Sequence, residues 1–366
     1  MKNRAAIVGI IASCAILAAE RRSVSAASPR AVTIELKLVG KTLVGEPLEW
    51  SKERIYLLDR SGWLHEFPPA EVVSYRSVSN RFTPYSPSEF RAALLRALGD
   101  GYRVTGTTHY LVAHPSDLGA EWAERFERLY RSFVRFFSVR GFRLERPRFL
   151  MTGIVCRDSR EFHAYSRKAE NISATGFEGY YSLISNRIAL HLSTSPSKSR
   201  EIDPLVHSVI IHEATHQTAY NTGVHNRFRP PPLWVCEGLA TLFEAPGVYD
   251  SSNYRTREDR INRLRYDHYM EGVLPNQTPE LLQAMVVSDE LFRRNPLAAY
   301  ALAWAYSFYL METHPRKLQD YLAVTASGKL FSPPTPKERL DDFVRVFGSD
   351  WRFLNAKFVR FMKELE

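Results

Sequence analysis

The most constraining stretch of the chain is His212-Glu213-Ala214-Thr215-His216, in which two histidines stand four residues apart. On an α-helix, four residues turn the chain by about 400°, so both imidazoles project from one face about a turn apart. Two imidazoles placed in this way can ligate one zinc ion at about 2.0–2.1 Å each. Glu213 flanks that face, where a general base is needed. The spacing alone also fits a buried helix, since Val209 lies on the same face as the two histidines.

A second segment, residues 232–244, supplies a third candidate ligand. It begins with prolines and continues as a helical pattern that contains Glu237, 21 positions after His216. That separation leaves room for the first helix to end, for a loop to reverse and for a carboxylate to return. A catalytic zinc takes three protein ligands and keeps a position for water, and two histidines with one glutamate are a known set. We therefore predict one zinc ion per chain, held by His212, His216 and Glu237.

Together the two segments resemble the gluzincin zinc metallopeptidases, the thermolysin-like superfamily, in which Glu-Gly-Leu-Ala, here residues 237–240, carries the third ligand. With Tyr180-Tyr181-Ser182 and Asn186-Arg187-Ile188 they also resemble a family of secreted bacterial proteins that is known as domain of unknown function 1570. That resemblance covers roughly residues 85–366. It implies a thermolysin-like peptidase fold with Glu213 as the general base, and it implies no particular substrate.

The resemblance points to further site residues. Many gluzincins place a hydroxyl donor on a helix after the third ligand, and Tyr300 resembles that donor, with Tyr306 and His225 as alternatives. An aspartate one turn after the third ligand commonly orients a metal-binding histidine. Here that position is Thr241, which departs from the pattern, and Glu244 on the same helical face could serve instead.

The N-terminus has the pattern of a secretory signal. Lys2 and Arg4 precede an apolar run over residues 5–19, and small residues follow at positions 24–27. We expect a leader of residues 1–26 and an exported protein that is periplasmic, extracellular or attached to the cell envelope. The apolar run is short for a membrane span. A retained leader or a lipid on Cys14 is the alternative, and membrane contact is expected only in those cases.

The composition limits the partners. The formal net charge is +9, which is a mild excess for 366 residues, and no nucleic-acid-binding motif is present, so a nucleic-acid partner is not expected. Cys156 and Cys236 are the cysteines that follow the leader, and we expect two buried thiols.

The chain is expected to have an α+β fold in two parts. Residues 30–78 alternate at period two around a turn at positions 59–62, which predicts a small β-barrel or β-roll of about five strands with Trp50 and Trp63 in its core. A linker at residues 77–84 leads to the metallopeptidase domain, residues 85–366. This domain becomes helical from residue 256, and the cleft is expected between its first, thermolysin-like lobe and the helical C-terminal lobe. Residues 187–192 are expected to form the sheet edge beside the cleft, or else an interior strand.

Two functions remain open at this point. The first is an exported zinc peptidase that hydrolyses a peptide or protein substrate with a metal-activated water. The alternative is a non-catalytic zinc-containing binding or scaffold protein of the same fold, and a zinc hydrolase of non-peptide amides is a further variant. Glu213 favours an enzyme, because a purely structural zinc site needs no base.

Overall fold

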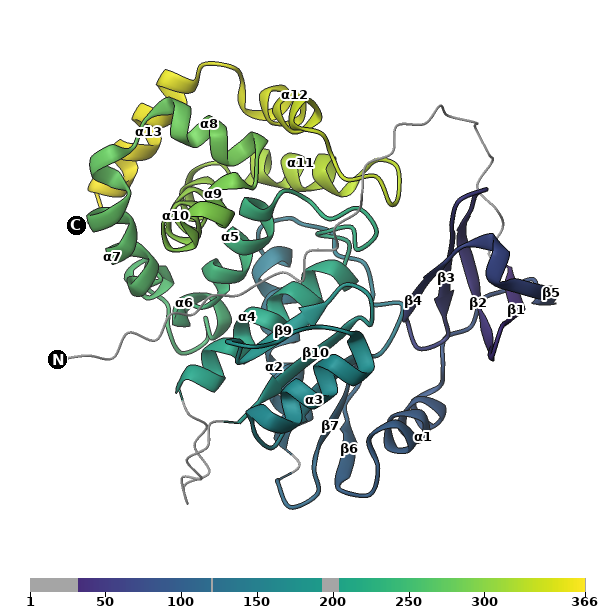
Figure 1. Ribbon diagram of the computed structural model, residues 1–366. Coiled ribbons are helices and arrows are strands. Elements are labelled where there is room, and N and C mark those ends of the chain that lie inside the picture. Colours follow the sequence, from purple (N-terminus) through teal and green to yellow (C-terminus); the bar gives the residue numbers. More distant parts are fainter. Residues whose placement is uncertain (1–31, 120, 193–203, 366) are drawn as a thin grey trace.

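The computed structural model describes residues 32–119, 121–192 and 204–365, which form a mixed α+β fold with two five-stranded sheets and 13 α-helices (Figure 1). The α+β class is thus confirmed. Among the described residues, no helix is both long and apolar enough to cross a membrane. The expected leader, residues 1–26, lies outside the described residues, as does Cys14.

The first sheet is antiparallel and open, so the prediction of a closed barrel is wrong. Its strand order is β4-β3-β2-β1-β5. The sheet contacts the rest of the chain at its β4 end, because the Leu64 N–H of β4 donates to the Ile184 carbonyl at 2.8 Å. On the neighbouring β3, the Tyr56 ring stacks on Phe331 with centroids 3.7 Å apart. β4 therefore faces the body of the molecule and β5 points away from it (Figure 1). The strands are β1 (Thr33–Leu38), β2 (Lys41–Trp50), β3 (Ile55–Asp59), β4 (Leu64–Phe67) and β5 (Val72–Ser79).

The two tryptophans of this sheet are not in its core, contrary to expectation. The core consists of Ile34, Leu36, Leu38, Ile55, Leu57 and Phe67. Trp50 is the last residue of β2, is 44% exposed and lies against Tyr75. Trp63 sits in the β3–β4 turn, half-buried beneath the guanidinium of Arg187. Both rings lie at strand ends, outside the apolar face that the strand centres form.

The second sheet carries the order β6-β7-β8-β10-β9, with β7, β8 and β10 parallel and an antiparallel strand at each edge. β10 pairs with both β8 and β9, so residues 187–192 are interior and the prediction that they form the edge is wrong. β9 is the edge strand because the turn at Asn186, with φ of 59°, folds β9 back outside β10. The strands are β6 (Tyr102–Gly106), β7 (Tyr110–Pro115), β8 (Met151–Cys156), β9 (Gly179–Ser182) and β10 (Arg187–His191).

Helices cover both faces of this sheet. Alternate residues of β7 point to opposite sides, so that Tyr110 and Val112 pack with α2 (Glu121–Ser138) and α4 (Pro204–Asn221), and Leu111 packs with α1 (Pro87–Leu98) and α3 (Ser159–Glu170). The start of α1 has the capping box that its sequence predicts, with Ser86 as the N-cap and Glu89 reaching back. The packing of α4 on the side of Tyr110 and Val112 holds this helix against the sheet.

The remaining helices form a separate lobe beyond α4 (Figure 1). Its centre is α10, which is buried along almost its whole length, and prolines begin α8, α10, α11 and α12. α10 packs closely on α5, next to α4. The helices are α5 (Leu233–Phe243), α6 (Pro246–Tyr249), α7 (Arg263–Gly272), α8 (Pro279–Val287), α9 (Glu290–Arg294), α10 (Pro296–Thr313), α11 (Pro315–Ala326), α12 (Pro336–Phe347) and α13 (Trp351–Lys363).

Candidate metal centre

The position of α4 is fixed by polar contacts to the sheet. The side-chain amide of Gln217 donates to the carbonyls of Thr152, at 3.1 Å, and Asn186, at 2.8 Å. Gln217 is fully buried, so leaving either carbonyl without a donor would cost about 1–3 kcal/mol. The preceding residue, His216, therefore has a defined place relative to the strands and points toward α5.

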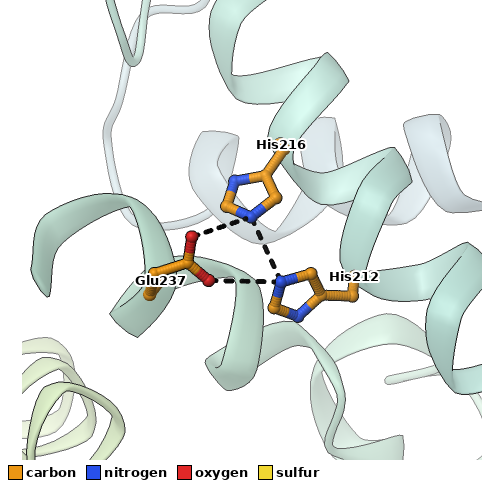
Figure 2. A group of neighbouring side chains, drawn as sticks. All are labelled: His212, His216 and Glu237. Carbon is orange, nitrogen blue, oxygen red and sulfur yellow. Dashed lines mark hydrogen bonds and ion pairs between the residues drawn. The ribbon is translucent and has the colours of Figure 1, made fainter. Parts of the chain in front are cut away.

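Three side chains from two helices converge at this place (Figure 2). His212 and His216 come from α4 and Glu237 from α5, and one ligand atom of each lies within 4.8 Å of the others. The Nε2 atoms of the two histidines are 3.2 Å apart. Glu237 Oε2 is 3.3 Å from His212 Nε2, and Glu237 Oε1 is 3.6 Å from His216 Nε2. The sequence-predicted ligands are thus neighbours in the fold.

The dimensions of this cluster fit a zinc ion. Two nitrogens that each lie about 2.0–2.1 Å from a tetrahedral ion are about 3.3–3.4 Å apart, close to the spacings between these side chains. Glu237 is 1% exposed, and an ionised carboxylate at that depth is costly unless a positive charge or hydrogen-bond donors lie beside it. Zinc binding itself remains a prediction.

In the absence of an ion, protonation of the histidines balances the negative charge of Glu237. Burial disfavours a charged His212, but hydrogen bonds to Glu237 and Glu244 outweigh it and raise the His212 pKa to about 10. Burial also opposes ionisation of Glu237, yet the positive charge of His216 and hydrogen bonds from both imidazoles hold its pKa well below the usual range. Without an ion, the cluster therefore favours a protonated His212 beside an ionised Glu237.

Glu213, the candidate base, is buried beside the cluster and is not one of its three ligands. Burial raises its pKa, and the negative charge of Glu237 acts in the same direction. The charges of the two histidines and a hydrogen bond from the backbone of Tyr181 act against this rise. Because Tyr181 belongs to β9, the carboxylate of Glu213 lies next to the edge strand of the sheet.

The fold brings Tyr300 to the cluster. It lies near the start of α10, and its ring centroid is 6.5 Å from that of His212. Burial raises the Tyr300 pKa well above its usual value, and the charge of Glu237 and a hydrogen bond with it add to the rise. The hydroxyl thus stays protonated next to the candidate ligand Glu237.

The two alternative donors are placed differently. Tyr306 points into the helical core, where its ring packs on Trp234 and Phe358. His225 is buried with its Nδ1 3.1 Å from the Val224 carbonyl. Burial, and then the charge of His216, lower the His225 pKa to about 3, so this imidazole is neutral.

Of the two candidates for orienting a histidine, Glu244 contacts one. Glu244 Oε1 lies 2.8 Å from Nδ1 of His212, which leaves Nε2 facing Glu237 and His216. The hydroxyl of Thr241 instead donates to the carbonyls of Glu237 and Gly238 in its own helix.

The sequence patterns gave no indication of two other residues near Glu244. Asn262 donates to Glu244 Oε2 at 2.7 Å, and Arg265 Nε lies 3.7 Å from the same oxygen. An asparagine in front of a helical pattern is a signal for an N-cap, which Asn262 is, but this signal does not reveal its second contact.

The cysteines lie outside the cluster. Both Cys156 and Cys236 are free and buried, which confirms the expected thiols. Burial raises the pKa of each thiol, so neither is a ready thiolate. Cys236 lies 3.1 Å from the Tyr220 hydroxyl although it precedes Glu237 in the sequence.

Comparison with known proteins finds a similarity that covers the candidate metal centre. No curated protein matches the chain. The segment from α4 to the residues after α11 carries all three candidate ligands together with Glu213, Glu244 and Tyr300. That segment, residues 206–332, matches the family model described as "Protein of unknown function (DUF1570)".

Proposed function

We propose that this protein is a zinc-dependent peptidase of the gluzincin type. One observation carries the proposal: ligand atoms of His212, His216 and Glu237 converge from two helices, while Glu213, which is not a ligand, lies beside them on α4. A site that only held an ion would need the three ligands and no further acid. A thermolysin-like arrangement of a sheet lobe, a metal helix and a helical lobe is part of the same proposal.

Each side chain has a defined task in this reaction. Bound to His212, His216 and Glu237, zinc would supply a Lewis acid that activates water and polarises the scissile carbonyl. Glu213 accepts the proton of the attacking water and later delivers it to the leaving amine. The Tyr300 hydroxyl donates a hydrogen bond to the carbonyl oxygen as negative charge develops there.

The proposed substrate is a peptide or protein in extended conformation. β9 is the sheet edge, and the Tyr181 backbone of this strand faces Glu213. A strand edge can pair with an extended peptide through main-chain hydrogen bonds, and specificity then comes from alternate side chains. Pairing on β9 would bring a peptide bond toward the proposed base. We place this reaction outside the cytoplasm, as the N-terminal leader pattern suggests.

The second candidate is a zinc-containing binding or scaffold protein. The burial of the centre favours it, since His212, Glu213, His216 and Glu237 are each no more than 7% exposed. Catalysis on a peptide requires that substrate reach Glu213. The same experiment therefore decides between the two functions.

Glu213→Gln tests the proposal directly. The variant should keep its zinc and its fold, because Glu213 is assigned as a base, and it should lose roughly 10²–10⁴-fold in turnover. Glu271→Gln, on the exposed end of α7, is the matched control and should cleave like the wild type. The assay is hydrolysis of a mixed peptide pool with zinc content measured in parallel. Undiminished cleavage by zinc-loaded Glu213→Gln would refute the mechanism, and a zinc-loaded wild type that cleaves no peptide would favour the binding protein.

A further inference from the structure

A buried polar cluster lies directly behind the metal ligands, centred on the carboxylate of Glu244. Its Oε1 faces His212 Nδ1 at 2.8 Å. Its Oε2 accepts a hydrogen bond from Asn262 Nδ2 at 2.7 Å and lies 3.7 Å from Nε of Arg265. One oxygen thus contacts a metal ligand, and the other contacts the start of α7. Asn262 also donates to the Thr241 carbonyl at 2.9 Å, which ties the cluster to the end of α5.

Arg265 occupies an unusual environment for a guanidinium. It is 2% exposed, and its Nε and Nη2 atoms have no hydrogen-bond partner among the described residues. Taking such a cation out of water costs several kcal/mol unless a negative charge compensates. Its neighbours are the carboxylate of Glu244 and the ring of Tyr300, whose centroid is 5.1 Å from the guanidinium carbon. What Arg265 provides here is a positive charge directed at these two side chains.

The metal centre needs that charge. To ligate an ion through Nε2, His212 must be neutral with its remaining proton on Nδ1. In this state His212 donates a hydrogen bond to Glu244 but gives it no positive charge. Arg265 is then the cation in contact with Glu244, among the ion pairs of the described residues. Asn262 fixes the direction of the carboxylate, because its amide also binds the Thr241 carbonyl.

We propose that Asn262 and Arg265 are positioning residues of the metal centre, holding Glu244 in the orientation that presents Nε2 of His212 to the ion. The inference rests on the proposed metal site. It adds two residues that contact Glu244, which in turn contacts the candidate ligand His212. α7 thereby joins the ligands of α4 and α5 to Tyr300 of α10 through one buried network.

Zinc affinity of the full chain measures this role without any substrate. Asn262→Asp keeps the side-chain oxygen that accepts a hydrogen bond from the backbone N–H of Arg265. It removes the side-chain N–H that donates to Glu244. Arg265→Met removes the buried charge at similar length, and Arg265→Lys keeps the charge. Arg263→Met makes the same replacement at an exposed position of α7 and is the matched control. Affinity is measured by competition with a chromophoric chelator, and Tm of the metal-free proteins reports the fold.

A double-mutant cycle with Glu244→Ala separates positioning from general stability. Asn262→Asp and Arg265→Met should each weaken zinc binding by about tenfold, the lower end of the range for residues that support ligands. In the Glu244→Ala background each should add less than about twofold, since its target is gone. Arg263→Met should change nothing, and Arg265→Lys should lose less affinity than Arg265→Met.

The outcomes distinguish this inference from the proposed function. Suppose that the wild type binds zinc. If the substitutions then reduce zinc affinity equally in the wild-type and Glu244→Ala backgrounds, or leave it unchanged in the single variants, the positioning role alone is overturned. A wild type that binds no zinc would overturn both. A folded, zinc-binding wild type that cleaves no peptide but shows the non-additive losses would uphold the positioning role and count against the peptidase.

Discussion

Gly238 of α5 lies so close to α10 that a Cβ at this position would stand 2.7 Å from the carbonyl oxygen of Ala303. The same Cβ would also lie 3.1 Å from Cβ of Ser307, so a flexible side chain moving aside would not relieve the contact. Gly238 follows Glu237, and α10 carries Tyr300. The absence of a side chain at position 238 thus allows a candidate metal ligand and the proposed hydroxyl donor to come together.

Gly238→Ala should therefore destabilise the protein, although alanine is the better helix former. Backbone atoms must shift to admit the methyl group, which typically costs about 1–3 kcal/mol. Gly272→Ala at the end of α7 is the control, because a Cβ there meets no atom within 4 Å, and it should leave stability unchanged or slightly raised. Thermal unfolding of both variants checks this. Equal Tm values for the two would contradict the tight contact between α5 and α10.

The candidate ligands predict the metal content. Wild-type protein should bind about one zinc, and His216→Ala and Glu237→Ala should each lose most of it, because a site with two ligands left binds far more weakly. Removal of zinc by a chelator should lower the Tm, since an ion that binds only the folded state stabilises it. Zinc affinity should also fall in acid, where protons compete for both imidazoles. Full zinc retention in both variants would exclude the assignment.

The sequence predicted the parts of the site that depend on local spacing. His212 and His216 follow from helix geometry, and Glu244 was suggested by the resemblance to the gluzincins together with its place on the helical face of Glu237. Asn262 and Arg265 gave no such signal, because they reach Glu244 from a different helix and only the packing of α7 brings them there. A spacing pattern reports residues on one element, and a contact between elements depends on the whole fold.

The fold shows the same division. The capping box at Ser86 and the prolines that begin helices were legible in the sequence, because they act within one turn. Within β2, Gly45 and Pro47 interrupt the strand pattern, so the bounds of this strand are not evident from the sequence. The place of the first sheet in the fold involves Tyr56 stacking on Phe331, a contact between distant parts of the chain that no local pattern reports. The edge position of β9 likewise depends on which strand β10 joins.

The β3–β4 turn predicts a pH-dependent contribution to stability. Asp59 accepts hydrogen bonds from the backbone of Ser61 and Trp63 and lies 2.9 Å from His65 Nε2. Burial alone would raise the Asp59 pKa, but these bonds outweigh it and lower that pKa. A lowered pKa in the folded state means that the stabilisation is present above the ordinary value of 3.8 and is lost as the pH falls through the folded value.

Asp59→Asn should accordingly lower stability at pH 5 by about 1–3 kcal/mol, the usual cost of losing a charged acceptor. The difference from wild type should begin to shrink as the pH falls below 3.8, where the carboxyl of the unfolded chain gains its proton, and should be smallest once the pH is below the lowered folded pKa. Tm values of both proteins across this range provide the measurement. A difference that stays constant down to the acid limit would show that the charge of Asp59 does not stabilise the turn.

The role of Tyr300 can be tested against a second tyrosine of the same helix. Tyr300→Phe should reduce kcat by about 10²-fold with little change in KM, because its hydroxyl is proposed to act on charge that develops in the transition state. Zinc content should not change, since Tyr300 is not a ligand. Tyr306→Phe removes a hydroxyl from the helical core, away from the ligands, and should leave kcat unaltered. Steady-state kinetics on a peptide that the wild type cleaves provide the measurement. A kcat loss confined to Tyr306→Phe would transfer the donor role to Tyr306, and normal kcat in both variants would exclude both tyrosines as the donor.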